Sequence, residues 1–134
     1  MFLLDTFVLS EMRKRRPGAN GVRWLKAKQE ATLFLSVVSP GEIERGIEKQ
    51  RRENVEFPSE LSRWLETLQN LCADRILHIT APIARRWGVL SAQLGHDGVD
   101  LLIAATALTH NLTVVTRNTK HFEPARVKLV NPFD

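Results

Sequence analysis

Four side chains with oxygen donors, spread widely along the chain, are of the types that hold a divalent cation: Asp5, Glu42, Asp100 and Asn118. Carboxylates brought close together repel one another, and a bound cation offsets that repulsion. Hard divalent ions prefer oxygen ligands, and Mg²⁺ is usually held by one or two carboxylates together with water and phosphate oxygens. Such an ion can activate water and neutralise charge on a phosphodiester. This chemistry requires a fold that brings the four residues together.

Short apolar segments alternate with amphipathic ones along the chain. Strands are predicted at residues 1–4, 33–38, 75–79, 112–115 and 127–130. Helices are predicted at residues 8–16, 22–28, 39–47, 58–71, 81–94 and 101–108. Alternation of strands and helices is typical of an α/β protein, so we expect three α/β/α layers with a central parallel sheet of four or five strands.

The carboxyl ends of parallel strands meet at one edge of the sheet, where sites form in such folds. Asp5 follows the first predicted strand, and Asn118 follows the fourth. Glu42 lies in the first turn of the helix after the second strand. Asp100 begins the helix over 101–108, which leads into the fourth strand and therefore runs opposite to the strands. We expect all four side chains at this edge, with helix N-termini favouring ionised Glu42 and Asp100.

Each acid also has a purely structural interpretation. The segment Ser39-Pro40-Gly41-Glu42 fits a capping box with Ser39 as the N-cap, and Asp97-Gly98-Val99-Asp100 has a similar form. Asp5 could cap the first helix. Capping is the simpler explanation for any one acid alone, whereas their joint placement at one edge favours a metal site.

Length and composition restrict the class of protein. The chain has 134 residues, the size of one domain. A single cysteine, Cys72, excludes an internal disulfide, and no apolar run approaches the ~18 residues that span a bilayer. Asp5 follows the apolar start too closely for a signal peptide, so we expect a cytoplasmic protein without a membrane anchor. The net charge of +4 permits a polyanionic partner without requiring one.

Four short motifs and the end of the chain resemble those of PIN-domain proteins, specifically the VapC/FitB-type toxin ribonucleases. The resemblance covers essentially the whole chain, so residues 1–134 are expected to form a single PIN domain. The segments that carry it are Leu3-Leu4-Asp5-Thr6-Phe7-Val8-Leu9-Ser10-Glu11, Leu35-Ser36-Val37-Val38-Ser39-Pro40-Gly41-Glu42, Asp100-Leu101-Leu102-Ile103-Ala104-Ala105, Thr116-Arg117-Asn118-Thr119-Lys120-His121-Phe122 and Asn131-Pro132-Phe133.

This resemblance implies a metal-dependent endoribonuclease that uses Mg²⁺ or Mn²⁺ and acts as the toxin of a toxin–antitoxin pair. The metal ligands would be Asp5, Glu42 and Asp100, with Asn118 as a fourth catalytic residue. It further implies an RNA substrate, a homodimer and a cognate antitoxin. Such antitoxins wrap the toxin, insert a basic side chain near the acids, and bind operator DNA themselves.

Two departures from the family pattern bear on the site. Phe7 stands where the family usually has Asn, so the orientation of Asp5 is expected to depend on Thr6 instead. Neither Asn118 nor His121 is acidic, although the family often has an acid at one of these positions. Fewer carboxylates predict one tightly held ion rather than two.

Basic residues near the acids are candidate contacts to RNA phosphates. Arg117, Lys120 and Arg45 are the main candidates, and Arg13, Lys14, Arg15 and Arg16 form a further basic run. A solvated surface charge is the alternative for each of them. The alternative for the whole chain is a catalytically degenerate PIN fold that binds an antitoxin or a nucleic acid. A flap-type DNA nuclease has no support, since it needs a longer chain with extra acids.

Overall fold

A computed structural model describes residues 1–14, 16–53 and 57–134 of the chain. The strands are β1 (Phe2–Leu4), β2 (Leu33–Ser36), β3 (Ile76–Leu77), β4 (Thr113–Val115) and β5 (Leu129–Val130). The α-helices are α1 (Thr6–Met12), α2 (Ala19–Lys26), α3 (Val38–Arg51), α4 (Phe57–Leu71), α5 (Ala81–Leu94), α6 (Val99–His110) and α7 (Thr119–Phe122). Short 3₁₀ turns, η1 (Glu30–Thr32), η2 (Ala73–Arg75) and η3 (Glu123–Ala125), connect some of them.

The strands form one parallel sheet in the order β3-β2-β1-β4-β5. This confirms the predicted sheet of four or five parallel strands. The chain lays β2 and β3 on one side of β1 and then crosses to place β4 and β5 on the other side. The direction of the strand order therefore reverses between β1 and β4, and sites in parallel sheets form at such a switch point.

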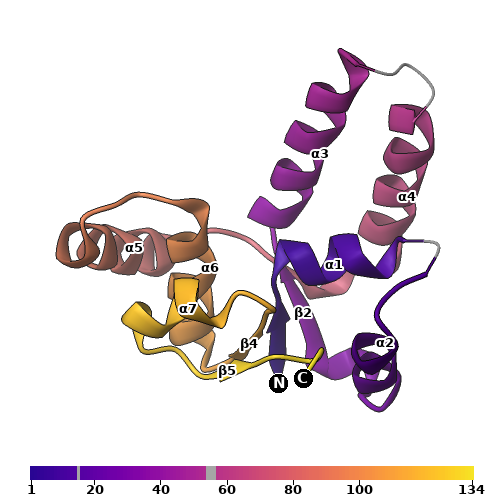
Figure 1. The fold of residues 1–134 in the computed structure, drawn as a ribbon. Helices are drawn as coiled ribbons and strands as arrows, with labels where there is room; N and C mark the ends of the chain where they lie inside the picture. The colour runs from indigo at the N-terminus through magenta and orange to yellow at the C-terminus, as the bar shows by residue number, and fades with distance from the viewer. Residues whose placement is uncertain (15, 54–56) are drawn as a thin grey trace.

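Helices cover both faces of the sheet, as predicted (Figure 1). Consecutive side chains of β1 point to opposite faces, so Leu3 and Leu4 belong to different parts of the core. Leu3 packs with α6 side chains such as Ile103 and with Phe122 of α7. Leu4 packs with Val8 of α1, and side chains of α2 and α4 extend that cluster. The α6 helix can approach the sheet closely because its buried face includes small alanine side chains.

Helices α3 and α4 form a hairpin that projects beyond the carboxyl edge of the sheet (Figure 1). Its own small core contains Ile43 and Ile47 from α3 and Leu61 and Leu65 from α4. Because α1 lies across the end of β1 beside this hairpin, the three helices surround one side of the edge where Asp5 lies. No helix of the described part of the chain is long and apolar enough to cross a membrane.

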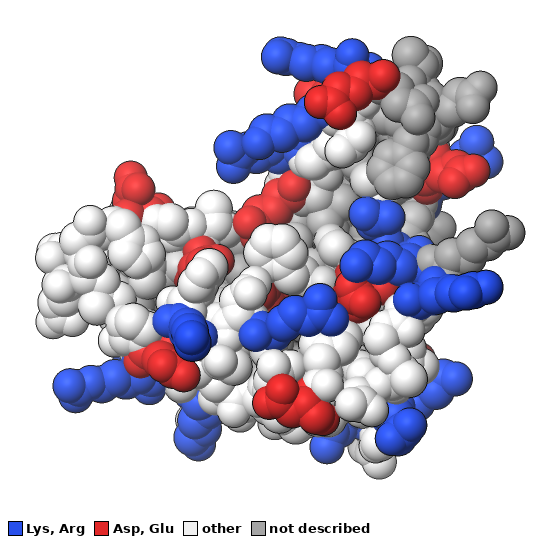
Figure 2. Space-filling model, viewed as in Figure 1, with Lys and Arg blue, Asp and Glu red and all other residues white. Residues whose placement is uncertain are grey.

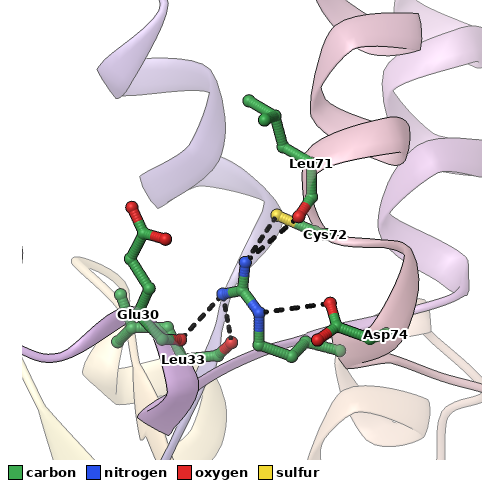
Figure 3. A network of polar contacts seen from close by, with 6 residues as sticks. Glu30, Leu33, Leu71, Cys72 and Asp74 are labelled. Atoms are coloured by element: carbon green, nitrogen blue, oxygen red, sulfur yellow. Dashed lines mark hydrogen bonds and ion pairs between the residues drawn. The ribbon is translucent and has the colours of Figure 1, made fainter.

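Arg75 ties the segment before β2 to the end of α4 (Figure 3). One guanidinium nitrogen donates to the carbonyl oxygens of Glu30 and Leu33 at 2.8 and 3.1 Å, and the other donates to the Leu71 carbonyl at 3.3 Å. The five donors of arginine lie in a rigid fork, so one side chain satisfies carbonyls from two separate segments. This contact helps to hold β2 and β3 in register near the amino end of the sheet.

The end of the chain closes over α2. The Phe133 ring lies so close to Gly21 that a Cβ at that glycine would meet the ring at 2.3 Å. Asn20 also donates a 3.2 Å hydrogen bond to the Phe133 carbonyl. A glycine is therefore required at position 21 for the ring to occupy its place. The Asn-Pro-Phe ending has a packing role that its sequence alone did not indicate.

Candidate active site

Asp5 lies at the carboxyl end of β1 and is almost fully buried, with 2% of its surface exposed. It stands at the N-cap position of α1 with an extended backbone, but its carboxylate makes no capping hydrogen bond. Instead, Oδ2 accepts a 2.8 Å hydrogen bond from the Thr116 hydroxyl. The register of the sheet explains this pairing, because Leu4 pairs with Val115 and the next residues of the two strands are Asp5 and Thr116.

The surroundings of Asp5 oppose its ionisation. Burial is the largest effect, and it raises the pKa of the Asp5 carboxyl to about 6. The Thr116 hydroxyl lowers this pKa, nearby Asp100 raises it, the Thr6 backbone N–H lowers it, and Glu42 raises it. Asp100 and Glu42 are therefore each close enough for their charges to oppose the ionisation of Asp5. Asp5 is mostly ionised at neutral pH, but in an environment that would be stabilised by a cation.

Glu42 is held by the residue that follows Asp5. The Thr6 hydroxyl donates a 2.6 Å hydrogen bond to Glu42 Oε1. The Thr6 oxygen also lies 2.8 Å from the Ser39 hydroxyl in the first turn of α3. A threonine hydroxyl has one proton, and Glu42 receives it, so Ser39 is the donor to Thr6. This buried chain of hydroxyls links α1 to α3 and fixes Glu42 beside Asp5.

These contacts correct two sequence-based interpretations. Ser39 is not an N-cap, because α3 begins at Val38 and the Ser39 side chain is turned to Thr6. Thr6 holds Glu42, and Thr116 is the side chain that holds Asp5. The prediction that Asp5 depends on Thr6 therefore missed its main side-chain partner. The strand register carried the missing signal, since Thr116 follows β4 as Asp5 follows β1.

Asp100 lies in the first turn of α6, at the same edge of the sheet, with one-third of its side chain exposed. The cap of this helix is Gly98, so the capping box proposed for Asp97 is absent. His121 of α7 approaches Asp100 instead, with 3.4 Å between Nδ1 and Oδ2. His121 stands at a position where the family often has an acid, and it places an imidazole beside the Asp100 carboxylate. The sequence did not predict this contact.

Asn118 lies between β4 and α7 and is half-buried. Its backbone N–H donates a 2.9 Å hydrogen bond to the Thr116 hydroxyl, the group that in turn donates to Asp5. Its side chain makes no capping hydrogen bond with α7. The backbone of Asn118 is thus connected to Asp5 through a single hydroxyl, which places this residue close to the carboxylates.

The donor set suits a hard divalent ion, since it consists of carboxylate oxygens whose mutual repulsion a cation would relieve. Within residues 1–14, 16–53 and 57–134, however, no three acidic, histidine or cysteine side chains are already gathered as a complete set of ligands. The hydrogen bond from Thr6 occupies one oxygen of Glu42. The residues therefore fit an ion that takes few protein ligands and completes its coordination with water or phosphate oxygens, as Mg²⁺ does.

The basic residues predicted to contact RNA differ in their surroundings. Arg117 is half-exposed, with its guanidinium carbon 4.2 Å from the centre of the Phe133 ring and Nη2 3.8 Å from Glu11. Lys14 lies 2.6 Å from Glu11 and is the main cause of the lowered pKa of that carboxyl. Arg45 on α3 and Lys120 on α7 are exposed. Arg15 lies outside the described residues.

The face shown in Figure 2 carries Lys and Arg side chains over α1 and along α3, with acidic side chains between them. The part of this face formed by α5 carries few charges. Basic and acidic side chains are thus interspersed on this face, and further basic side chains lie along its lower edge.

Comparison with known proteins agrees with this geometry. Residues 2–127 match the family model of the PIN domain. The chain is 33% identical to the VapC ribonuclease Y4jK of Sinorhizobium fredii, over 100% of this chain and 99% of that protein. It is 31% identical to the toxin FitB of Neisseria gonorrhoeae, over 99% of each chain. The solved structure of FitAB bound to an IR36 DNA fragment superimposes with a TM-score of 0.86 at 31% identity, covering 100% of this chain and 96% of that one.

Proposed function

The chain belongs to the PIN-domain family as a VapC/FitB-type toxin, and from this premise we propose that it is a divalent-metal-dependent endoribonuclease. The observation that carries this proposal is the buried carboxylate of Asp5, which Asp100 and Glu42 repel and which lies at the switch point of the sheet. Asp5 stands at the N-cap of α1 without a side-chain capping hydrogen bond, and its Oδ2 is bound instead by Thr116 from the neighbouring strand.

Asp5 and Asp100 would hold the ion directly. Glu42 would complete the set through water, or directly after giving up its bond to Thr6. The bound ion, Mg²⁺ or Mn²⁺, would supply positive charge for the phosphodiester and lower the pKa of an attacking water. Asn118, which is connected to Asp5 through the Thr116 hydroxyl, would help to orient the water. Arg117, Lys120 and Arg45 would contact the RNA backbone, which positions the substrate without selecting its sequence.

Within this proposal each hydroxyl has a defined task. Thr116 favours the ionised form of Asp5 and orients its carboxylate, because its single proton is directed to Oδ2. Thr6 and Ser39 hold Glu42 at the edge and prevent it from turning to solvent. His121, when protonated, would moderate the charge of Asp100 before the ion binds. These contacts preorganise a site whose carboxylates would otherwise move apart.

We further propose that the whole chain, residues 1–134, acts as one PIN domain and as a homodimer in the cytoplasm. Its partner would be a cognate antitoxin that binds operator DNA, by analogy with the FitAB complex on DNA. The antitoxin would block the acidic edge by placing a basic side chain there. The antitoxin would thus offset the same carboxylate repulsion that the metal offsets in the active enzyme.

The test compares wild type with Asp100→Asn. Calorimetry with Mn²⁺ should show one ion per chain for wild type and a sharply weakened site for the variant. RNA cleavage should require Mg²⁺ or Mn²⁺, stop with EDTA and be lost in the variant. Unchanged Mn²⁺ affinity in Asp100→Asn would overturn the assignment of the ligands. Metal-independent RNA binding without cleavage in wild type would favour the degenerate PIN module that Phe7 and Asn118 suggest.

A further inference from the structure

Phe7 is exposed at the entrance to the candidate site. About 60% of its surface is accessible, although its neighbours Thr6 and Val8 are buried. Among the exposed large apolar side chains that the structure describes, Phe7 is the aromatic one. It immediately follows the threonine that holds Glu42. An exposed aromatic ring beside the reacting groups is a feature that folding alone does not require.

A cavity of about 520 Å³ opens beside this ring, between α1, α3 and α4. Phe7, Ile43 and Leu61 provide its apolar walls, and Thr6 and Glu42 line the same cavity. Because Glu42 borders both the cavity and the acidic edge, the two are continuous. A substrate group held in the cavity would therefore lie close to the phosphodiester bond positioned at Asp5.

Polar groups complete the walls. Ser10, Arg13 and Gln50 line the cavity along the faces of α1 and α3. Ser10 and Gln50 can both donate and accept hydrogen bonds, and arginine is a donor that also binds phosphate. An aromatic surface combined with hydrogen-bonding side chains and a cation is the combination that proteins use to hold unpaired bases of single-stranded RNA.

We propose that this cavity is a nucleobase subsite, in which Phe7 stacks against the base of a nucleotide that adjoins the phosphodiester at the carboxylates. This inference rests on the proposed ribonuclease function and deepens it. The base would enter between α1 and the α3–α4 hairpin, with its flat face on the Phe7 ring and its edge toward Ser10 and Gln50. The replacement of the family's usual Asn by Phe7 would thus add a contact to the substrate.

A nucleobase suits the cavity better than an apolar side chain of a protein partner. The polar residues of its walls would lose hydrogen bonds to water if an aliphatic group covered them, and a base edge can replace those bonds. The position of Glu42 in the wall also requires an occupant that tolerates a carboxylate. Amino groups of bases donate hydrogen bonds to such a group.

Binding measurements in the Asp5→Asn background with EDTA separate this subsite from catalysis. The probes are a short oligoadenylate and an oligomer of the same length that lacks every base. Base stacking predicts that the oligoadenylate binds tighter by roughly 5- to 150-fold. Adding Phe7→Leu should remove most of that difference without changing the affinity of the abasic oligomer, whereas Phe7→Trp should preserve it.

Val89→Ala is the matched control, because Val89 is also exposed (56%) and belongs to α5, a helix that lies far from α1 in Figure 1. This control should bind the oligoadenylate and the abasic oligomer with the same affinities as its parent. Thermal unfolding should be unchanged in the Phe7 variants, since the ring contributes little to the core. Equal affinities of Phe7→Leu and its parent for oligoadenylate would overturn the subsite. If that variant instead lost affinity only for a co-expressed antitoxin, the cavity would be assigned to the protein partner.

The two proposals fail separately. If wild type cleaves RNA and Phe7→Leu cleaves every sequence at the wild-type rate, the subsite is overturned and the ribonuclease function stays intact. Wild type that fails to cleave with Mg²⁺ or Mn²⁺, but binds bases through Phe7, would overturn the ribonuclease function. In that second case the cavity would remain a base-binding site of a non-catalytic PIN fold.

Discussion

The Thr116 hydroxyl donates a 2.8 Å hydrogen bond to Oδ2 of Asp5 across the two neighbouring strands where the order of the sheet reverses. The same hydroxyl oxygen accepts the backbone N–H of Asn118 at 2.9 Å. The proton of Thr116 therefore points to the carboxylate. This contact lowers the pKa of Asp5 and so partly offsets the larger effect of burial, which raises it.

Replacing Thr116 with valine should raise the pKa of Asp5 further. A hydrogen bond to a charged group contributes about 1.5–3 kcal/mol, so its loss should move the titration of Asp5 upward by about one pH unit or more. Thr116→Ser should keep the wild-type titration, because serine retains the hydroxyl. Carbon-13 NMR titration of the aspartate carboxyls measures this directly. An unchanged midpoint in Thr116→Val would show that the hydrogen bond has no electrostatic role.

Asp5→Asn should stabilise the metal-free protein at neutral pH and abolish RNA cleavage. The pKa of Asp5 is raised by burial to about 6 in the folded state, so folding retains a proton that the unfolded chain releases above pH ~4. Wild-type stability therefore falls as pH rises from about 4 to about 6 and stays lower above that window. The variant does not lose this stability, so its free energy of unfolding should exceed that of wild type by at most roughly 3 kcal/mol at neutral pH.

Urea unfolding with EDTA at pH 4, 5 and 7.5 checks the sign of this effect. The free energy of unfolding of Asp5→Asn should exceed that of wild type at pH 7.5, by less at pH 5 and not at all at pH 4. Asparagine can still accept the hydrogen bond from Thr116, so the comparison isolates the charge. A variant that is no more stable than wild type at pH 7.5 would contradict the unfavourable environment of the Asp5 carboxylate.

Arg117→Ala should weaken RNA binding for all sequences. If Arg117 contacts a phosphate, the dependence of log affinity on log salt should become flatter by about 0.7 for single-stranded RNA. A salt series with Ca²⁺, which suppresses turnover, measures both quantities, and Lys128→Ala serves as an exposed basic control. Because Arg117 also packs on Phe133, a lowered melting temperature with an unchanged salt slope would assign it to structure instead.

Gly21→Ala should destabilise the fold, because its new methyl group would overlap the Phe133 ring. Overpacking of this kind costs about 1–3 kcal/mol. Gly88→Ala in α5 is the matched control, since a Cβ there meets no atom within 4 Å. It should stabilise the protein by about 0.5–1 kcal/mol through helix propensity. Chemical denaturation of both variants checks the prediction, and stabilisation by Gly21→Ala would refute the closure of α2 by Phe133.

The sequence predicted the parallel sheet and the edge at which Asp5 and Asp100 lie, because both depend on the alternation of strands and helices along the chain. The helix over 81–94 has the predicted bounds, starting after Thr80 and ending at Gly95, since each end has a strong local signal. The prediction of Ser39 as an N-cap was wrong, because a serine before a helix is a good cap by its local sequence, whereas its actual partner, Thr6, is distant in sequence. Local patterns carry no information on such pairings.

The third strand is shorter in the structure than the sequence predicts. The apolar run over 75–79 predicted a longer strand, but only Ile76 and Leu77 pair with β2. Arg75 instead belongs to the 3₁₀ turn η2, where its backbone N–H donates to the Cys72 carbonyl at 2.8 Å, and its guanidinium binds the carbonyls of Glu30 and Leu33. His121 likewise gave no signal, because only the packing of α7 against α6 brings it to Asp100. Tertiary contacts decided these positions.

The pairing of β1 with β4 also governs when the site can form during protein synthesis. Asp5 and Thr116 are separated by 111 positions, so the ribosome must add all the residues between them before the central strand gains its second neighbour. A growing polypeptide therefore carries Asp5 through the synthesis of those residues without the hydroxyl that orients it. An incomplete polypeptide that stops before β4 would carry Asp5 and Glu42 without the geometry of the complete site.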